Sequence, residues 1–121
     1  MSPATLCLVA LGGALGSVLR ALAGQALPAG RLPWATIVVN VAGSLLIGWL
    51  MARFAGQGGA GARGQAFWVV GVCGGFTTFS AFSWQSIELV QKGHVGAAAA
   101  NVVLSVSLCL AATWAGWKLA Q

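Results

Sequence analysis

Four long apolar runs are the feature that most limits what this chain can fold into. They cover about residues 4–23, 33–53, 66–90 and 96–118 and carry almost no charge. A helix needs about 20 apolar residues, within a range of about 17–25, to cross the hydrocarbon core of a bilayer. The segments between the runs are rich in glycine or proline, or very short, as is typical of loops. The sequence therefore predicts an all-α membrane protein, with residues 1–121 forming a single domain of four transmembrane helices.

The composition excludes several other classes of protein. Charged residues are only 6% of the chain and hydrophobic residues are 59%, whereas a typical soluble domain has about 25% charged residues. A soluble globular enzyme and a disordered chain are both excluded on this ground. The net charge of +5 comes from scattered basic residues, which form no patch for nucleic acid. Cys7, Cys73 and Cys109 lie in apolar runs without metal-ligand spacing, and we interpret them as small buried hydrophobic residues.

The basic residues give the four helices no preferred direction of insertion. Four crossings place the N-terminus, the second loop and the C-terminus on one side of the membrane. The two sides carry three basic residues each: Arg53, Arg63 and Lys118 on one, and Arg20, Arg31 and Lys92 on the other. Orientation normally follows an excess of Lys and Arg on the cytoplasmic side. Either one charge near a boundary is assigned to the wrong side, or copies insert both ways and pair antiparallel.

Small residues recur at a spacing that favours close contact between helices. The pattern small-x-x-x-small occurs at Gly12 and Gly16, and again at Ser44 and Gly48 and at Gly71 and Gly75. Such pairs let helix backbones approach one another in a membrane. Three of them in four helices predict a tightly packed bundle.

Two rows of neutral polar residues follow helical spacing. Thr36, Asn40 and Ser44 share one face of the second run, and the fourth run carries Asn101, Ser105, Cys109 and Thr113 at every fourth position. Polar groups at this depth are costly unless they meet a partner or line a water path. The rows either form hydrogen bonds between helices or line a path for a small solute.

The centre of the third run predicts a break in its helix. Gly74 and Gly75 are followed by two β-branched residues, Thr77 and Thr78, and this combination is a poor helix former. Non-helical backbone inside a membrane is tolerated only where it is buried in protein or lines a cavity. A break there frees carbonyl groups that can bind a cation and exposes a half-helix N-terminus that attracts an anion.

The titratable residues argue against an enzyme. The chain has one acid, Glu88, near the end of the third run, and one histidine, His94, in a loop. No carboxylate pair, Ser/His/Asp set or metal cluster can be assembled from these groups.

Three motifs resemble a known family, the Fluc fluoride channels, also called the CrcB family. They are Gly13-x-x-Gly16-x-x-x-Arg20, then Asn40-x-x-Gly43-x-x-x-x-Gly48, then Gly74-Gly75-Phe76-Thr77-Thr78-Phe79-Ser80-x-Phe82-Ser83. The similarity extends through all four runs, and the third motif is the most specific. The resemblance implies a passive fluoride channel, assembled as an antiparallel homodimer with two pores and one central Na⁺. The dual topology that it implies agrees with the balanced count of basic residues.

The resemblance also implies roles for individual residues. Asn40 is similar to the amide donor that lines the pore, and Phe79 and Phe82 to the aromatic pair whose ring edges face fluoride. Gly74 and Thr77 resemble the residues whose backbone carbonyls hold Na⁺. The remaining pore positions are Asn101 and Ser105 in the fourth helix and Arg20 near a pore end.

Two positions depart from the family pattern, and two other functions compete. Gln85 replaces an acid, and Cys109 replaces a hydroxyl on the fourth helix. A small proton-coupled multidrug exporter also has four spans, but it needs a membrane carboxylate that the first run does not supply. A non-transporting subunit that anchors a larger enzyme is the other alternative. For each of the three functions we expect a multi-pass protein of the cell (inner or plasma) membrane.

Overall fold

The computed structural model describes residues 1–121 and is almost entirely helical. Its elements are α1 (Pro3–Ala26), α2 (Trp34–Phe54), η1 (Gly58–Gly61), α3 (Ala62–Gly64), η2 (Gln65–Cys73), α4 (Gly74–Phe76), α5 (Phe79–Gln91) and α6 (Val95–Leu119). Four helical stretches are long and apolar enough to cross a membrane, and the third, Gly58–Gln91, combines η1 through α5. The predicted four-helix architecture is confirmed.

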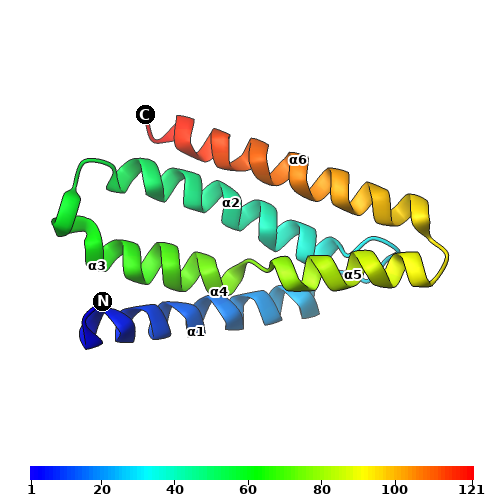
Figure 1. The fold of residues 1–121 in the computed structure, drawn as a ribbon, viewed down its shortest axis with the longest axis horizontal. Helices are drawn as coiled ribbons and strands as arrows, with labels where there is room; N and C mark the ends of the chain where they lie inside the picture. The colour runs from blue at the N-terminus through cyan, green and yellow to red at the C-terminus, as the bar shows by residue number, and fades with distance from the viewer.

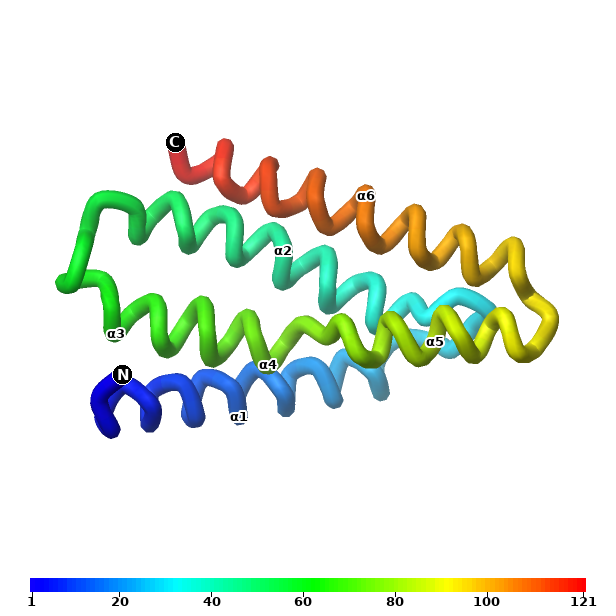
Figure 2. Tube along the Cα trace, in the orientation of Figure 1, coloured from blue at the N-terminus to red at the C-terminus, as the bar shows by residue number.

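The four spans run alternately up and down, so both chain termini lie at the same end of the molecule (Figure 1). The third span occupies the middle, with α1 packed along η2 and α4 and with α2 packed along α6 (Figure 2). In consequence α2 and α6 run parallel to each other, and their C-terminal residues Arg53 and Lys118 lie at the same end.

The helix limits differ from the predicted spans mainly at the second loop. The glycine-rich stretch from Phe54 to Gln65 was expected to be a loop, but it is helical from Gly58 onward. A 3₁₀ turn leads into the span here, and the chain enters it through Gly56 and its first residue Gly58, with φ of +81° and +54°. Only glycine adopts such angles without strain. Composition alone therefore overestimated the length of this loop.

Glycines at the predicted contact positions bring helix backbones together. A Cβ atom added at Gly16 would overlap the carbonyl oxygen of Val72 in η2, and one at Gly75 would overlap that of Gly13 in α1. Between α2 and α6 the same holds for Gly48 against Thr113. The close packing predicted from the small-residue pattern is confirmed at these contacts, because no larger residue fits there without a backbone shift.

Most large apolar side chains point away from the bundle. Only 20 of the 121 residues are buried, as expected when the surrounding solvent is lipid rather than water. All three cysteines are free: Cys73 is buried and Cys109 is half-buried, but Cys7 is exposed. The interpretation of Cys7 as a buried residue was wrong, because it lies on the outward face of α1.

Candidate functional site

The third span is broken at two threonines. Thr77 and Thr78 have extended backbone angles, with φ/ψ of −92°/158° and −151°/117°. Gly74 and Gly75 remain helical, so the predicted break is confirmed but it falls on the β-branched residues. Thr78 then begins the next helix as its N-cap, because its Oγ1 accepts a hydrogen bond from the Ala81 backbone N–H at 3.1 Å.

The half-span before the break is itself unusual. Residues Gln65–Cys73 form a π-helix, in which the Gly74 N–H bonds back to the Val69 carbonyl. A π-helix is wider than an α-helix, is rare, and is found frequently at functional sites. The composition of this stretch gave no signal for it, since wide and ordinary helices share the same apolar pattern.

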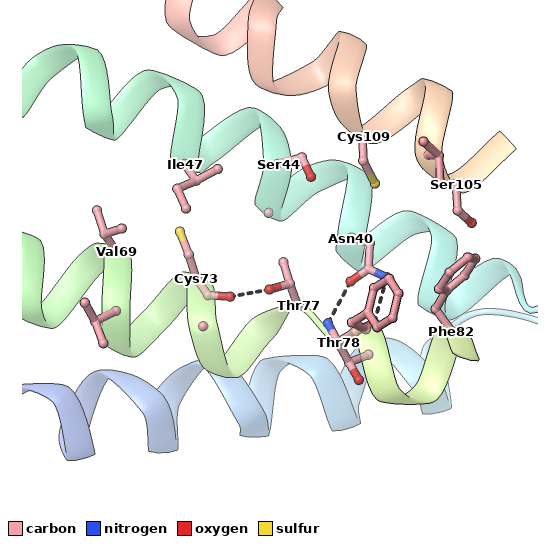
Figure 3. Close-up of a pocket in the computed structure, with 15 residues that line it drawn as sticks. Asn40, Ser44, Ile47, Val69, Cys73, Thr77, Thr78, Phe82, Ser105 and Cys109 are labelled. Carbon is pink, nitrogen blue, oxygen red and sulfur yellow. Dashed lines mark hydrogen bonds between the residues drawn. The ribbon is translucent and has the colours of Figure 1, made fainter. Parts of the chain in front are cut away.

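Asn40 of α2 satisfies the exposed backbone at the break. Its Oδ1 accepts from the Thr78 N–H at 2.7 Å, and its Nδ2 donates to the Thr78 carbonyl at 3.0 Å (Figure 3). An amide side chain is the group that can serve a backbone donor and acceptor together. The pair of bonds joins α2 to the start of α5 and leaves one Nδ2–H of Asn40 without a protein acceptor.

The backbone carbonyl groups around the break differ in whether they accept a hydrogen bond. The Cys73 carbonyl accepts from both the backbone and the hydroxyl of Thr77, at 3.0 and 2.8 Å. The Gly75 carbonyl accepts from Arg20 Nε of α1 at 3.0 Å. The carbonyls of Gly74 and Thr77 accept no hydrogen bond across the break. Two acceptors therefore remain free at the depth where acceptors are normally paired.

An open groove of about 400 Å³ lies beside the break, between the third span, α2 and α6. Its wall combines a few polar groups with apolar side chains, as Figure 3 shows. Six of the predicted site residues line it: Asn40, Gly74, Thr77, Phe79, Phe82 and Ser105. The groove also includes Ser44, Cys73 and Thr78, which were not among the predicted pore or ion-binding residues.

The two phenylalanines of the groove differ sharply in exposure. Their ring centroids are 5.4 Å apart with an interplanar angle of 58°, so each ring presents part of its edge to the other. Phe82 is 9% exposed, whereas Phe79 is 77% exposed. Phe79 therefore has no packing partner on its outer side within one chain.

The polar row of α6 divides between two environments. Asn101 is fully buried, at 0% exposure, and its Nδ2 donates to Ser86 Oγ of α5 at 2.9 Å. Ser86 in turn donates to the Phe82 carbonyl at 2.8 Å, and Ser105 donates to Asn101 Oδ1 at 3.2 Å. The first half of the row thus joins α5 to α6, while Ser105 and Cys109 also line the groove.

Two predicted residues lie apart from the groove. Arg20 and Asn101 are not among its lining residues; the first contacts the far side of the break and the second lies inside the α5–α6 contact. Sequence reasoning also missed Ser86, because Ser83, Gln85 and Glu88 close to it made one more polar residue unremarkable.

A second cavity, of about 280 Å³, lies where the loop between α1 and α2 covers the end of α5. Gln85 lines it, and its Oε1 is buried without a hydrogen-bond partner. Glu88 and Lys92 lie at the same place and form an exposed ion pair at 3.3 Å.

Comparison with known proteins identifies the family. The family model described as "CrcB-like protein, Camphor Resistance (CrcB)" matches residues 7–117. The chain belongs to the CrcB family. The resemblance drawn from the three motifs is therefore confirmed.

Curated CrcB relatives match over nearly their whole length. The protein named "Fluoride-specific ion channel FluC" of Paramagnetospirillum magneticum is 48% identical over 93% of this chain and 91% of its own. The protein of the same name from Opitutus terrae is 50% identical over 89% and 86%. That of Rhodospirillum rubrum is 48% identical over 93% and 91%. These names place the CrcB chain among ion channels rather than enzymes.

Proposed function

We propose that this CrcB protein is a passive, fluoride-selective channel that exports fluoride and lowers its concentration in the cytoplasm. The observation that carries the proposal is the break at Thr77 and Thr78, which adjoins an open groove with an amide and two aromatic rings. We take fluoride as the ion because the relatives are named fluoride-specific ion channels. A passive channel requires no acid or base chemistry, in agreement with a chain that has a single carboxylate.

Fluoride is small and strongly hydrated, so a path for it needs hydrogen-bond donors or other positive groups. The remaining Nδ2–H of Asn40 is one such donor on the groove wall. The edges of Phe79 and Phe82 carry the positive part of the aromatic quadrupole and can replace some water without holding the ion tightly. Conduction needs binding weak enough for release, which favours these neutral groups over a basic residue in the path.

The roles of the two fourth-helix residues follow from their positions. Ser105 lines the groove, and we propose it as a polar contact of the fluoride path. Asn101 holds Ser105 in position, because its Oδ1 accepts a hydrogen bond from the Ser105 hydroxyl. Asn101 is itself held by the hydrogen bond that its Nδ2 donates to Ser86. In this proposal Asn101 acts on the pore through Ser105.

We also propose a structural Na⁺ held by the carbonyls of Gly74 and Thr77. Both residues line the groove and neither carbonyl accepts a hydrogen bond across the break. Uncharged backbone oxygens are the donor type that ion channels use for alkali cations. The residues present therefore fit the ion, but two carbonyls are too few to enclose it. A second copy of the chain would supply the others.

An antiparallel homodimer with two pores completes this proposal. The groove is open on the side of Phe79, whose ring is 77% exposed, and an opposed copy would close it. Arg53, Arg63 and Lys118 lie near one end of the molecule and Arg31 and Lys92 near the other, so the basic residues give insertion little preferred direction. We place this dimer in the cell (inner or plasma) membrane, with residues 1–121 as one transmembrane domain in each copy.

Fluoride efflux from liposomes tests the function directly. The purified protein is reconstituted, external fluoride is followed with an electrode, and chloride efflux is the control. Fast loss of fluoride without loss of chloride is expected. Equal loss of both ions would contradict selectivity. A folded protein that releases neither ion would favour the enzyme-anchoring subunit, and drug-driven proton movement would favour the exporter.

A further inference from the structure

Arg20 is the residue whose position least agrees with a role in the fluoride path. It lies well inside α1, which continues to Ala26, and its side chain is half-buried. A charged group at such depth is costly and normally has a partner that explains it. The only acid of the chain, Glu88, forms its ion pair with Lys92, so Arg20 has no carboxylate to balance it.

The partner of Arg20 is the backbone of the broken span. Its Nε–H donates to the Gly75 carbonyl at 3.0 Å, and it is not among the residues that line the groove. In an unbroken helix the Gly75 carbonyl would accept from the N–H four residues later. The break removes that donor, and Arg20 replaces it from the neighbouring helix.

The bond lies where the backbones of α1 and the broken span are already in close contact. A Cβ added at Gly75 would overlap the Gly13 carbonyl, so the backbones touch one residue away from the free carbonyl of Gly74. Holding Gly75 against α1 therefore restrains the adjoining residue Gly74, which lines the groove. A cation near the C-terminal end of a half-helix is also favourable for its dipole.

From this geometry we infer that Arg20 is a positioning residue: it caps the Gly75 carbonyl through Nε–H and thereby holds the adjoining groove-lining backbone in place, rather than attracting fluoride by its charge. The inference rests on the proposed channel function for its flux readout. It also differs from the role that the family resemblance implied for Arg20.

Three substitutions separate the hydrogen bond from the charge. In glutamine, Nε2 lies the same number of bonds from Cα as Nε does in arginine, so Arg20→Gln keeps the donor and removes the charge. Arg20→Met keeps a similar length and removes both. Arg20→Lys keeps the charge but moves the donor one bond farther and loses the planar fork.

The experiment measures fluoride efflux and the thermal unfolding midpoint of all three variants beside the wild type. The exposed residue Arg63, in α3 at the start of the third span, supplies a matched control, Arg63→Gln, for loss of a positive charge alone. We expect Arg20→Gln to keep at least about half of the wild-type flux and Arg20→Met to lose about tenfold, the order of one lost hydrogen bond to a charged group. Arg20→Lys should fall below Arg20→Gln.

Each other outcome counts against the inference in a recognisable way. If Arg20→Gln and Arg20→Met lose flux equally while Arg20→Lys keeps it, the charge is what matters and the capping role is overturned. Wild-type flux in all three variants would remove Arg20 from the mechanism altogether. An equal loss of flux in all three would mean that neither the charge nor the Nε–H donor alone accounts for its role, and would overturn the capping role. If Arg20→Met does not fold, the comparison of glutamine with lysine still decides. If the wild type itself is silent, the proposed function fails, and a higher unfolding midpoint for Arg20→Gln than for Arg20→Met tests the cap alone.

Discussion

The two sides of the broken third span differ in how fully a single chain packs against them and satisfies their hydrogen bonds. On the side of α1, Gly71 and Gly75 meet the opposing backbone with no room for a side chain, and Arg20 satisfies the carbonyl that the break leaves free. On the side of the groove, a Cβ at Gly74 would lie 3.9 Å from its nearest neighbour, and Phe79 is exposed.

This difference indicates that the α1 side is a structural support and that the groove side is the candidate functional site. The α1 side is close-packed and hydrogen-bonded, so it holds the span in place. The groove side keeps carbonyls and an aromatic ring without partners in the chain, and polar groups at this depth persist only where a cavity or another partner serves them. Four predictions test the distinction, beginning with the one of largest expected effect.

Gly75→Ala should have the largest effect because it adds a side chain on the close-packed α1 side of the third span. The added methyl group would overlap the Gly13 carbonyl, and both atoms belong to helix backbones that cannot move independently. Overpacking of this kind typically costs about 1–3 kcal/mol, occasionally more. We expect little folded protein, measured as the yield of monodisperse protein after detergent extraction.

The neighbouring substitution Gly74→Ala is the matched control for this effect. Its methyl group would meet only an ordinary contact at 3.9 Å, so folded protein should be recovered. Gly24→Ala, with nothing within 4 Å, sets the baseline. Equal yields from Gly74→Ala and Gly75→Ala would show that the two sides are not distinct.

Asn40→Asp should abolish fluoride efflux. The change replaces the donor to the Thr78 carbonyl with a charged oxygen, and a charge near the bilayer centre costs at least about 2.5–3.5 kcal/mol. We expect flux to fall at least about a hundredfold in the liposome assay. Ser17→Ala, at an exposed position of α1 outside the groove, is the control. Flux near the wild-type rate would remove Asn40 from the pore.

Replacing each phenylalanine by isoleucine should separate conduction from packing. Phe79→Ile and Phe82→Ile both remove a ring edge from the groove, and flux should fall about two- to tenfold in each. Only Phe82 is buried, so only Phe82→Ile should also lower the thermal unfolding midpoint, by an amount that corresponds to about 1 kcal/mol. Unchanged flux in both variants would mean that the rings serve packing alone.

Lys92→Gln should have the smallest effect of the four. Its ion pair with Glu88 is 3.3 Å long, but water reaches both side chains, which are 62% and 40% exposed, and such pairs on a helix contribute about 0.3–0.5 kcal/mol. We expect the unfolding midpoint to shift by less than the scatter between preparations, at low and at high salt. A large loss of flux would reveal a role for the second cavity, which this residue lines.

Much of the fold could be predicted from the chain because each prediction depended on local chemistry. The length of the apolar runs determined the number of spans, and the small residues at every fourth position located the helix contacts, including those of Gly16 and Gly48. The glycine and threonine pairs together predicted the break, which falls on the threonines. The π-helix at Gln65–Cys73 could not be predicted, because its residues suit either kind of helix.

Within the candidate site, the least predictable residues were those whose partner is far away in the sequence. Asn101 and Ser105 lie on the same polar row of α6. Asn101 is nevertheless buried and bonded to Ser86, whereas Ser105 lines the groove. Arg20 was expected near a pore end, and its bond to Gly75 spans 55 positions. No pattern within one helix specifies which backbone group a side chain will reach on another.

The sequence by itself determined that this CrcB chain crosses a membrane four times, that its third span breaks, and which family it resembles. It could do so because lipid forces the backbone into helices and makes each interruption conspicuous. Only the tertiary structure decided that Asn40 bonds to Thr78, that Arg20 takes one carbonyl, and that those of Gly74 and Thr77 stay free. The physical reason is that a broken helix leaves several equivalent acceptors, and their partners depend on which helices pack beside them.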